Sequence, residues 1–128
     1  MIDDMGIFRT NMEVAHVSRR DERRVLHDVM VDTGSEFNWI PRDILISLGV
    51  EPERDEKFET ADGRVLTRQV GFARLFTAGR SAIAAVVFAE PGDMTLLGAV
   101  GLESLNLRVD LGRKELVPAG PVPVAVAA

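Results

Sequence analysis

The part of the chain best suited to chemistry is the segment Asp32-Thr33-Gly34-Ser35, which directly follows a run of apolar residues at 29–31. An acid at the end of an apolar strand is partly desolvated, and burial makes its charged form costly. The hydroxyl groups of Thr33 and Ser35, with local backbone N–H groups, can hold such a carboxylate in a fixed geometry for acid or base work. Gly34 lets the backbone approach closely. The other interpretation is an Asp-Thr-Gly turn between two strands, which many β proteins contain.

The elements that lead into this segment are predicted to be strands. Residues 7–17 alternate apolar and polar side chains with a period of two, which is typical of a half-buried strand. A second strand is predicted over residues 25–31, and the charged stretch 18–24 is expected to be the solvated turn between the two. The acid of the segment therefore lies where the second strand ends.

The middle of the chain is predicted to contain a helix and a long hairpin. A helix is expected over residues 41–48, because a proline opens it and Gly49 follows its apolar face. Residues 56–61 and 64–77 flank Asp62-Gly63, a dipeptide that tolerates the positive φ angles of a two-residue turn. We therefore expect a hairpin with Asp62-Gly63 at its tip.

The last third of the chain is predicted to be short strands around one helical turn. Residues 82–89 are an apolar run of strand length that should lie centrally. A short strand at 94–97 and a helical turn at 100–105 follow, and the pattern ends with strands at 107–111 and 115–117. We expect an all-β fold with one or two short helices, formed by residues 1–119 as a single domain. The tail, residues 120–128, is either flexible or an added strand at an interface.

Composition limits the classes of function. The chain has 128 residues with 15 basic and 20 acidic side chains, so its net charge of -5 argues against a nucleic-acid partner. There is no cysteine, and the only histidines are His16 and His27, so we assign no metal and no cofactor. The N-terminus has two acids, Asp3 and Asp4, where a secretory signal would carry bases, and no apolar run reaches the ~18 residues of a membrane span. We expect a cytoplasmic protein with no membrane partner.

In the order and spacing of its motifs the sequence resembles the retropepsin-like aspartic proteases, including the bacterial members of that clan. The resemblance covers residues 6–118. Asp32-Thr33-Gly34-Ser35 matches the active-site motif, and a short strand at 37–40 and the helix from Pro41 follow it in the family order. The hairpin tipped by Asp62-Gly63 takes the place of the flap. Leu96-Leu97-Gly98 and its helix match the element that packs behind the catalytic loop.

The resemblance implies a closed, barrel-like β fold and a homodimer that hydrolyses peptide bonds of a peptide or protein substrate. Asp-Thr-Gly occurs once in the chain, whereas this mechanism needs two facing carboxylates, so a two-fold axis would supply the second. It implies catalytic roles for Asp32, Thr33 and Gly34, with Thr33 bonding across the two-fold axis. Contacts to substrate are expected from four residues, Ser35, Ala61, Asp62 and Gly63.

Some residues depart from the family pattern. Ala99 stands where retroviral members usually have an arginine, while Glu36 lies near the position of its acidic partner, and the flap tip has a single glycine. An alternative function is therefore a catalytically weak or silent retropepsin-like module for dimerisation or peptide binding. A more distant alternative is a β domain with an incidental Asp-Thr-Gly turn. Trp39, the only tryptophan, is expected to pack in the core or an interface and receives no functional role.

Overall fold

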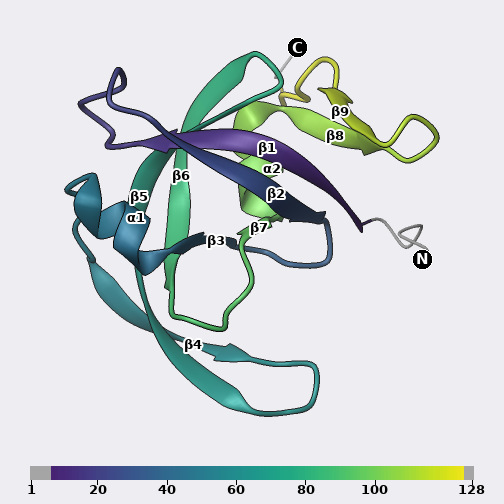
Figure 1. Ribbon diagram of the computed structural model, residues 1–128. Helices are drawn as coiled ribbons and strands as arrows, with labels where there is room; N and C mark the ends of the chain where they lie inside the picture. Colours follow the sequence, from purple (N-terminus) through teal and green to yellow (C-terminus); the bar gives the residue numbers. More distant parts are fainter. Residues whose placement is uncertain (1–6, 126–128) are drawn as a thin grey trace.

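A computed structural model describes residues 7–125 of the chain (Figure 1). Nine strands and two short helices follow one another along these residues: β1 (Ile7–Ala15), β2 (Arg24–Asp32), β3 (Asn38–Pro41), α1 (Arg42–Ser47), β4 (Arg54–Glu59), β5 (Val65–Thr77), β6 (Arg80–Ala89), β7 (Leu96–Leu97), α2 (Ala99–Leu105), β8 (Leu107–Asp110) and β9 (Glu115–Pro118).

Six of the strands close into a ring. The main sheet has the order β1-β2-β7-β3-β6-β5-β4, and β1 pairs with β5 as well, so the sheet returns to its first strand. Strand β4 stays outside the ring as the outer strand of the β4–β5 hairpin, which extends below the ring in Figure 1. Strands β8 and β9 form a separate two-stranded sheet. The prediction of an all-β, barrel-like fold with two short helices is confirmed.

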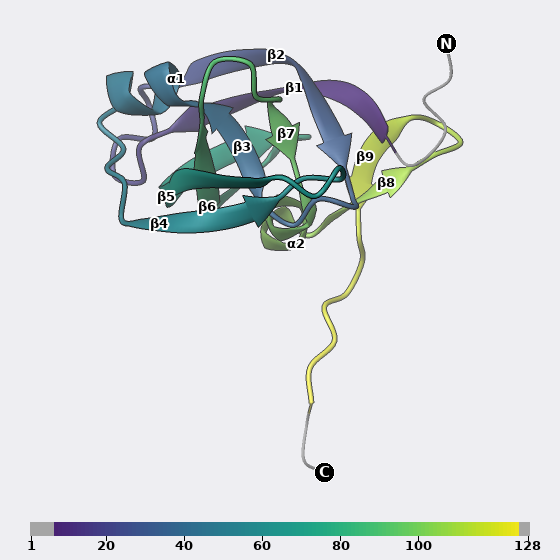
Figure 2. The same ribbon diagram turned by 90° about the horizontal axis from the view of Figure 1, so that it is seen from below.

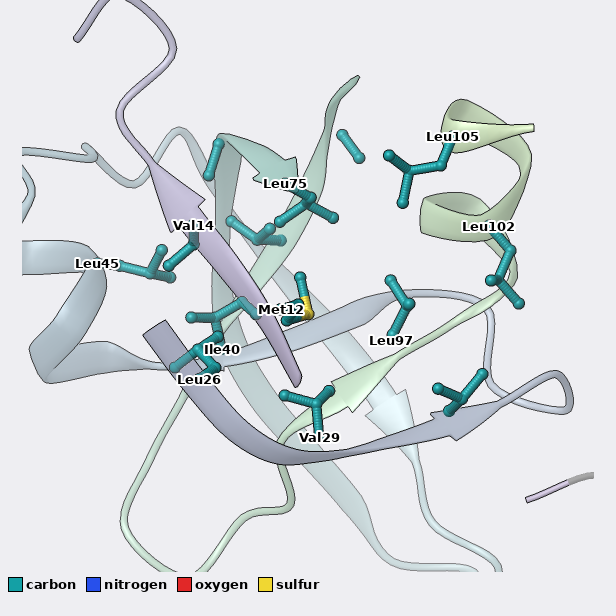
Figure 3. Close-up of a cluster of buried hydrophobic side chains, with 14 of the residues drawn as sticks. Met12, Val14, Leu26, Val29, Ile40, Leu45, Leu75, Leu97, Leu102 and Leu105 are labelled. Atoms are coloured by element: carbon teal, nitrogen blue, oxygen red, sulfur yellow. The ribbon is translucent and has the colours of Figure 1, made fainter. Parts of the chain in front are cut away.

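The core fills the ring and is built from alternate residues of its strands. Val29 and Val31 of β2 are fully buried, because a period of two sends both of them to the inner face. Figure 3 shows side chains from β1, β2, β3, β5 and β7 meeting inside the ring. Leu45 of α1 closes the core on one side, and Leu102 and Leu105 of α2 close it on the other. The strand that carries the candidate acid is thus fixed by apolar packing up to its last residue.

Two predicted elements differ from the observed ones. The turn at the hairpin tip has three residues rather than two, because Thr60 N–H donates to the Arg64 carbonyl and Gly63 alone adopts a positive φ of 85°. The strand predicted at 94–97 is reduced to Leu96–Leu97, and Met94 is exposed in the loop before it.

The end of the chain leaves the body of the protein. Residues 121–125 form no helix or strand and extend away from the ring in Figure 2, with Val122 and Val124 69% and 78% exposed. Residues 1–6 of the predicted domain and residues 126–128 of the predicted tail lie outside the described residues. The domain boundary at 119 therefore stays a prediction. Neither helix within residues 7–125 has the length and apolar character needed to cross a membrane.

Candidate active site

The carboxylate of Asp32 is held by its own loop at the end of β2. The backbone N–H of Gly34 donates to Asp32 Oδ1 at 2.9 Å, and Ser35 Oγ donates to Asp32 Oδ2 at 3.1 Å. The Ser35 N–H also donates to the Asp32 carbonyl, which closes a tight turn. Asp32 is half-buried, and both of its carboxylate oxygens accept hydrogen bonds from the loop. A carboxylate held in a fixed position in this way is suited to exchanging a proton with a group that reaches it.

Helix α2 and β7 support the loop from behind. The N–H groups of Ala99 and Val100, which have no acceptor inside the helix, donate to the carbonyls of Ser35 and Glu36, both at 2.8 Å. A Cβ on Gly98 would lie 2.7 Å from the Ser35 carbonyl oxygen and 3.0 Å from that of Glu36. Only glycine therefore fits at 98 without moving the loop, which explains the apolar-apolar-glycine pattern noted in the sequence.

Asn38 links this support to the rest of the ring. Its side chain is fully buried; Nδ2 donates to the Ala85 carbonyl and Oδ1 accepts the Gly98 N–H, each at 2.9 Å. These bonds satisfy one backbone group on β6 and one at Gly98 between β7 and α2, and an amide carries both the donor and the acceptor that they need. The sequence reasoning missed Asn38, because nothing local distinguishes it from a surface asparagine.

A groove of about 480 Å³ runs between the Asp32 loop and β4. Gly34 and Ser35 line it on one side, and residues 56–59 line it on the other. Phe58 of β4 packs edge-on against Phe37 and Trp39, with ring centroids 5.6 and 5.0 Å away. All three aromatic side chains are half-buried and form an apolar wall. The groove therefore combines this apolar wall with the charged residues Glu36, Glu56, Lys57 and Glu59, and it lies beside the loop that holds the candidate acid.

The sequence-predicted site residues divide into two groups. Asp32, Gly34 and Ser35 lie together in one hydrogen-bonded loop, and of these Gly34 and Ser35 line the groove. Thr33 is exposed beside them, and its hydroxyl forms no hydrogen bond within residues 7–125. The flap residues Ala61, Asp62 and Gly63 are exposed at the hairpin tip and do not line the groove. The roles predicted for these residues stay predictions.

The groove also changes the interpretation of Trp39. The sequence offered it only a packing role, whereas it is half-buried and lines the groove that holds Gly34 and Ser35. Phe37 and Phe58 were not singled out in the sequence. The available signal was the clustering of Phe37 and Trp39 immediately after the Asp-Thr-Gly-Ser motif.

The hairpin tip is held by its own polar contacts. Thr60 Oγ1 donates to Asp62 and accepts the Arg64 N–H at 3.0 Å, and Arg64 Nε lies 3.1 Å from Asp62 Oδ2. The Thr60 hydroxyl and the Arg64 guanidinium hold the pKa of the Asp62 carboxyl below its ordinary value. The tip is thus a compact, charged turn. Among the described residues no three His, Asp or Glu side chains are placed to hold a metal ion.

A closed ring of strands with a single Asp-Thr-Gly-Ser loop facing a long hairpin is the architecture of a single-lobed aspartic protease. A family profile described as aspartyl protease matches residues 18–100, which include this loop and the whole hairpin. The chain belongs to the aspartyl protease family, and the resemblance inferred from its motifs is confirmed at that level. Membership of the bacterial branch stays a prediction.

Other comparisons add less. The solution structure of the Simian Foamy Virus (mac) protease is similar to this chain with 19% sequence identity and a TM-score of 0.48, over 73% of this chain and 92% of the viral one. No curated protein matches the chain.

Proposed function

We propose that the protein is a homodimeric aspartic endopeptidase in which Asp32 and the Asp32 of a second copy activate water between them. The observation that carries the proposal is the Asp32 carboxylate, which Gly34 and Ser35 hold by hydrogen bonds while the same two residues line a groove with an aromatic wall. Membership of the aspartyl protease family supports the same chemistry. Because the motif occurs once, the second carboxylate has to come from another chain.

Each site residue has a proposed part in the reaction. One Asp32 takes a proton from water, and the other, protonated, donates a hydrogen bond to the scissile carbonyl. Gly34 lets the peptide backbone approach, Ser35 orients the carboxylate, and Thr33 bonds across the two-fold axis. The tip residues, Ala61 to Gly63, close over the peptide once it is bound.

The test is the Asp32→Asn variant, because the amide keeps the size of the side chain and cannot act as a base. Unfolded proteins are incubated with each variant at a range of pH, new peptide termini are read by mass spectrometry, and oligomeric state is read by sedimentation. We expect cleavage by the unaltered chain, none by Asp32→Asn, and the same sedimentation for both. Asp55→Asn removes an exposed carboxylate of β4 and should leave cleavage intact. Equal cleavage by the Asp32→Asn variant would refute the proposal.

The second candidate function is a catalytically silent module that binds peptides. It is favoured by the hairpin tip, which forms its polar contacts with itself and does not line the groove. Such a module would retain a peptide without producing new termini, so the same assay distinguishes the two functions. The homodimer and the cytoplasmic location stay predictions in either case.

A further inference from the structure

A second cavity, of about 540 Å³, lies away from Asp32. Its walls come from β1, from the loop that joins β1 to β2, and from the turn between β5 and β6. In Figure 1 the β1–β2 loop and the β5–β6 turn lie at the upper end of the molecule, opposite the β4–β5 hairpin. The volume falls within the ~300–1,000 Å³ typical of small-molecule sites.

The lining of this cavity is cationic although the whole chain is acidic. Arg20, Arg23 and Arg80 line it, and Glu13 is the only acidic side chain among the lining residues. The chain as a whole carries a net charge of -5. Three guanidinium groups around one concave surface therefore stand out against their surroundings and give the cavity a local positive potential.

Two of these arginines are held in place by the fold. The Arg23 guanidinium stacks over the Phe76 ring at 3.7 Å, donates from Nε to the Arg20 carbonyl, and pairs through Nη1 with Glu13 at 3.1 Å. Arg80 Nη1 donates to the carbonyl of Leu105 at the end of α2. A guanidinium has five N–H donors, so both groups keep donors that these contacts do not use. Such fixed donors lose little entropy when they bind an anion.

The cavity also has an apolar part. Met12 and Phe76 contribute to its lining while remaining almost fully buried, and Val25 is half exposed at its rim. Arg20 completes the rim, and its side chain forms no hydrogen bond or ion pair with any residue from 7 to 125. A ligand that fits this cavity needs an oxyanion to bind the arginines and an apolar body to pack against Met12, Phe76 and Val25.

We propose that this cavity binds a small organic anion that carries a carboxylate or a phosphate group on an apolar body. The site is separate from the groove beside Asp32, and the proposal does not depend on the protein being a protease. Arg23 and Arg80 supply fixed donors to the oxyanion, and Arg20 closes over it from the loop.

The experiment uses the full chain labelled with ¹⁵N and follows its amide resonances during titration. The probes are phenyl phosphate, benzoate and the neutral benzyl alcohol. We expect saturable shifts at residues 11–13 and 76–81 with at least one of the two anions, smaller shifts with the alcohol, and none centred on residues 34–39. A preference for phenyl phosphate or for benzoate identifies which oxyanion the cavity takes.

Variants then assign the binding to the arginines. Arg20→Gln removes one charge without disturbing a contact of the fold, and it should lower the affinity for the anion about tenfold. Arg23→Gln should lower the affinity by a similar factor. The control is Arg113→Gln, in the turn between β8 and β9, where the arginine pairs with Glu115 on the surface. The proposal is refuted if neither anion saturates, if benzyl alcohol binds as well as the anions, if Arg113→Gln weakens binding as much as Arg20→Gln, or if the shifts centre on residues 34–39.

Discussion

The guanidinium of Arg68 binds both carboxylate oxygens of Asp93, with Nε 2.7 Å from Oδ2 and Nη2 3.0 Å from Oδ1. The two side chains are only 17% and 13% exposed. Arg68 lies in β5, in the part of the hairpin that pairs with β4, and Asp93 lies in the loop between β6 and β7. Asp93 Oδ2 also accepts the N–H of Glu90. The pair therefore joins the hairpin to the loop that leads to β7.

This pair makes stability depend on pH. Hydrogen bonds from Arg68 hold the pKa of Asp93 below its ordinary 3.8. A carboxyl group with a depressed folded-state pKa stabilises the fold above the pKa of its unfolded state, and the contribution is lost as pH falls through the lower folded value. We expect Asp93→Asn to lower the free energy of unfolding by about 2 kcal/mol at pH 7, with a smaller difference below about pH 4. Urea unfolding of both chains from pH 3 to 7 measures this, and a difference that does not change with pH would contradict it.

Asn38 should contribute more to stability than an exposed asparagine. Asn38→Ala leaves the Ala85 carbonyl and the Gly98 N–H without partners in a buried region, and we expect a loss of about 2–4 kcal/mol in the free energy of unfolding. Asn11→Ala removes an exposed acceptor and should lower the free energy of unfolding by well under half as much. Urea unfolding at pH 7 compares the two variants. Equal losses would mean that the buried bonds of Asn38 add nothing specific.

Ser35 is expected to act on the rate more than on substrate binding. Ser35→Ala removes the hydrogen bond to Asp32 Oδ2 and leaves the carboxylate held by Gly34 alone, so its orientation becomes less fixed. We expect kcat for peptide hydrolysis to fall about tenfold with KM little changed, and Ser35→Thr to recover most of the loss because it restores the hydroxyl. A rise in KM at constant kcat would show instead that Ser35 contacts the substrate.

Activity per chain should fall on dilution, because a dimer that supplies half of its site from each copy dissociates by mass action. Without the family arginine at position 99, the interface of the proposed dimer would rely on apolar segments, and Val122 and Val124 are the most exposed large apolar side chains described. A chain ending at Gly120 keeps the bond from Asn106 Nδ2 to the Gly120 carbonyl and removes both valines. On dilution, the specific activity of this shorter chain should begin to fall at a higher protein concentration than that of the full chain.

Sedimentation of the same samples provides the control for the dilution series. Constant activity per chain in samples that sediment as monomers would refute the shared site. An intact dimer with full activity after truncation would refute only the role of the tail.

The sequence by itself determined the position of the candidate acid and the class of the fold. The alternation along β1 and β2 predicts strands, and the apolar run that precedes Asp32 places this residue at a strand end, because side-chain period and burial are linked locally. Glycine at 98 was also visible as part of a motif. These features depend on residues that lie close together in the chain, so a single sequence contains them.

Tertiary structure alone decided how these pieces meet. The pairing of β1 with β5, which closes the ring, joins Glu13 to Phe76, and the bonds of Asn38 join it to Ala85 and Gly98. Such contacts between residues distant in the chain leave no periodic pattern in the sequence, because they depend on how the strands are ordered and how the sheet curls. The same holds for the contact of Phe58 with Phe37 and Trp39, and for the position of Arg80 in the same cavity as Arg20 and Arg23, because each joins segments that are distant in the sequence.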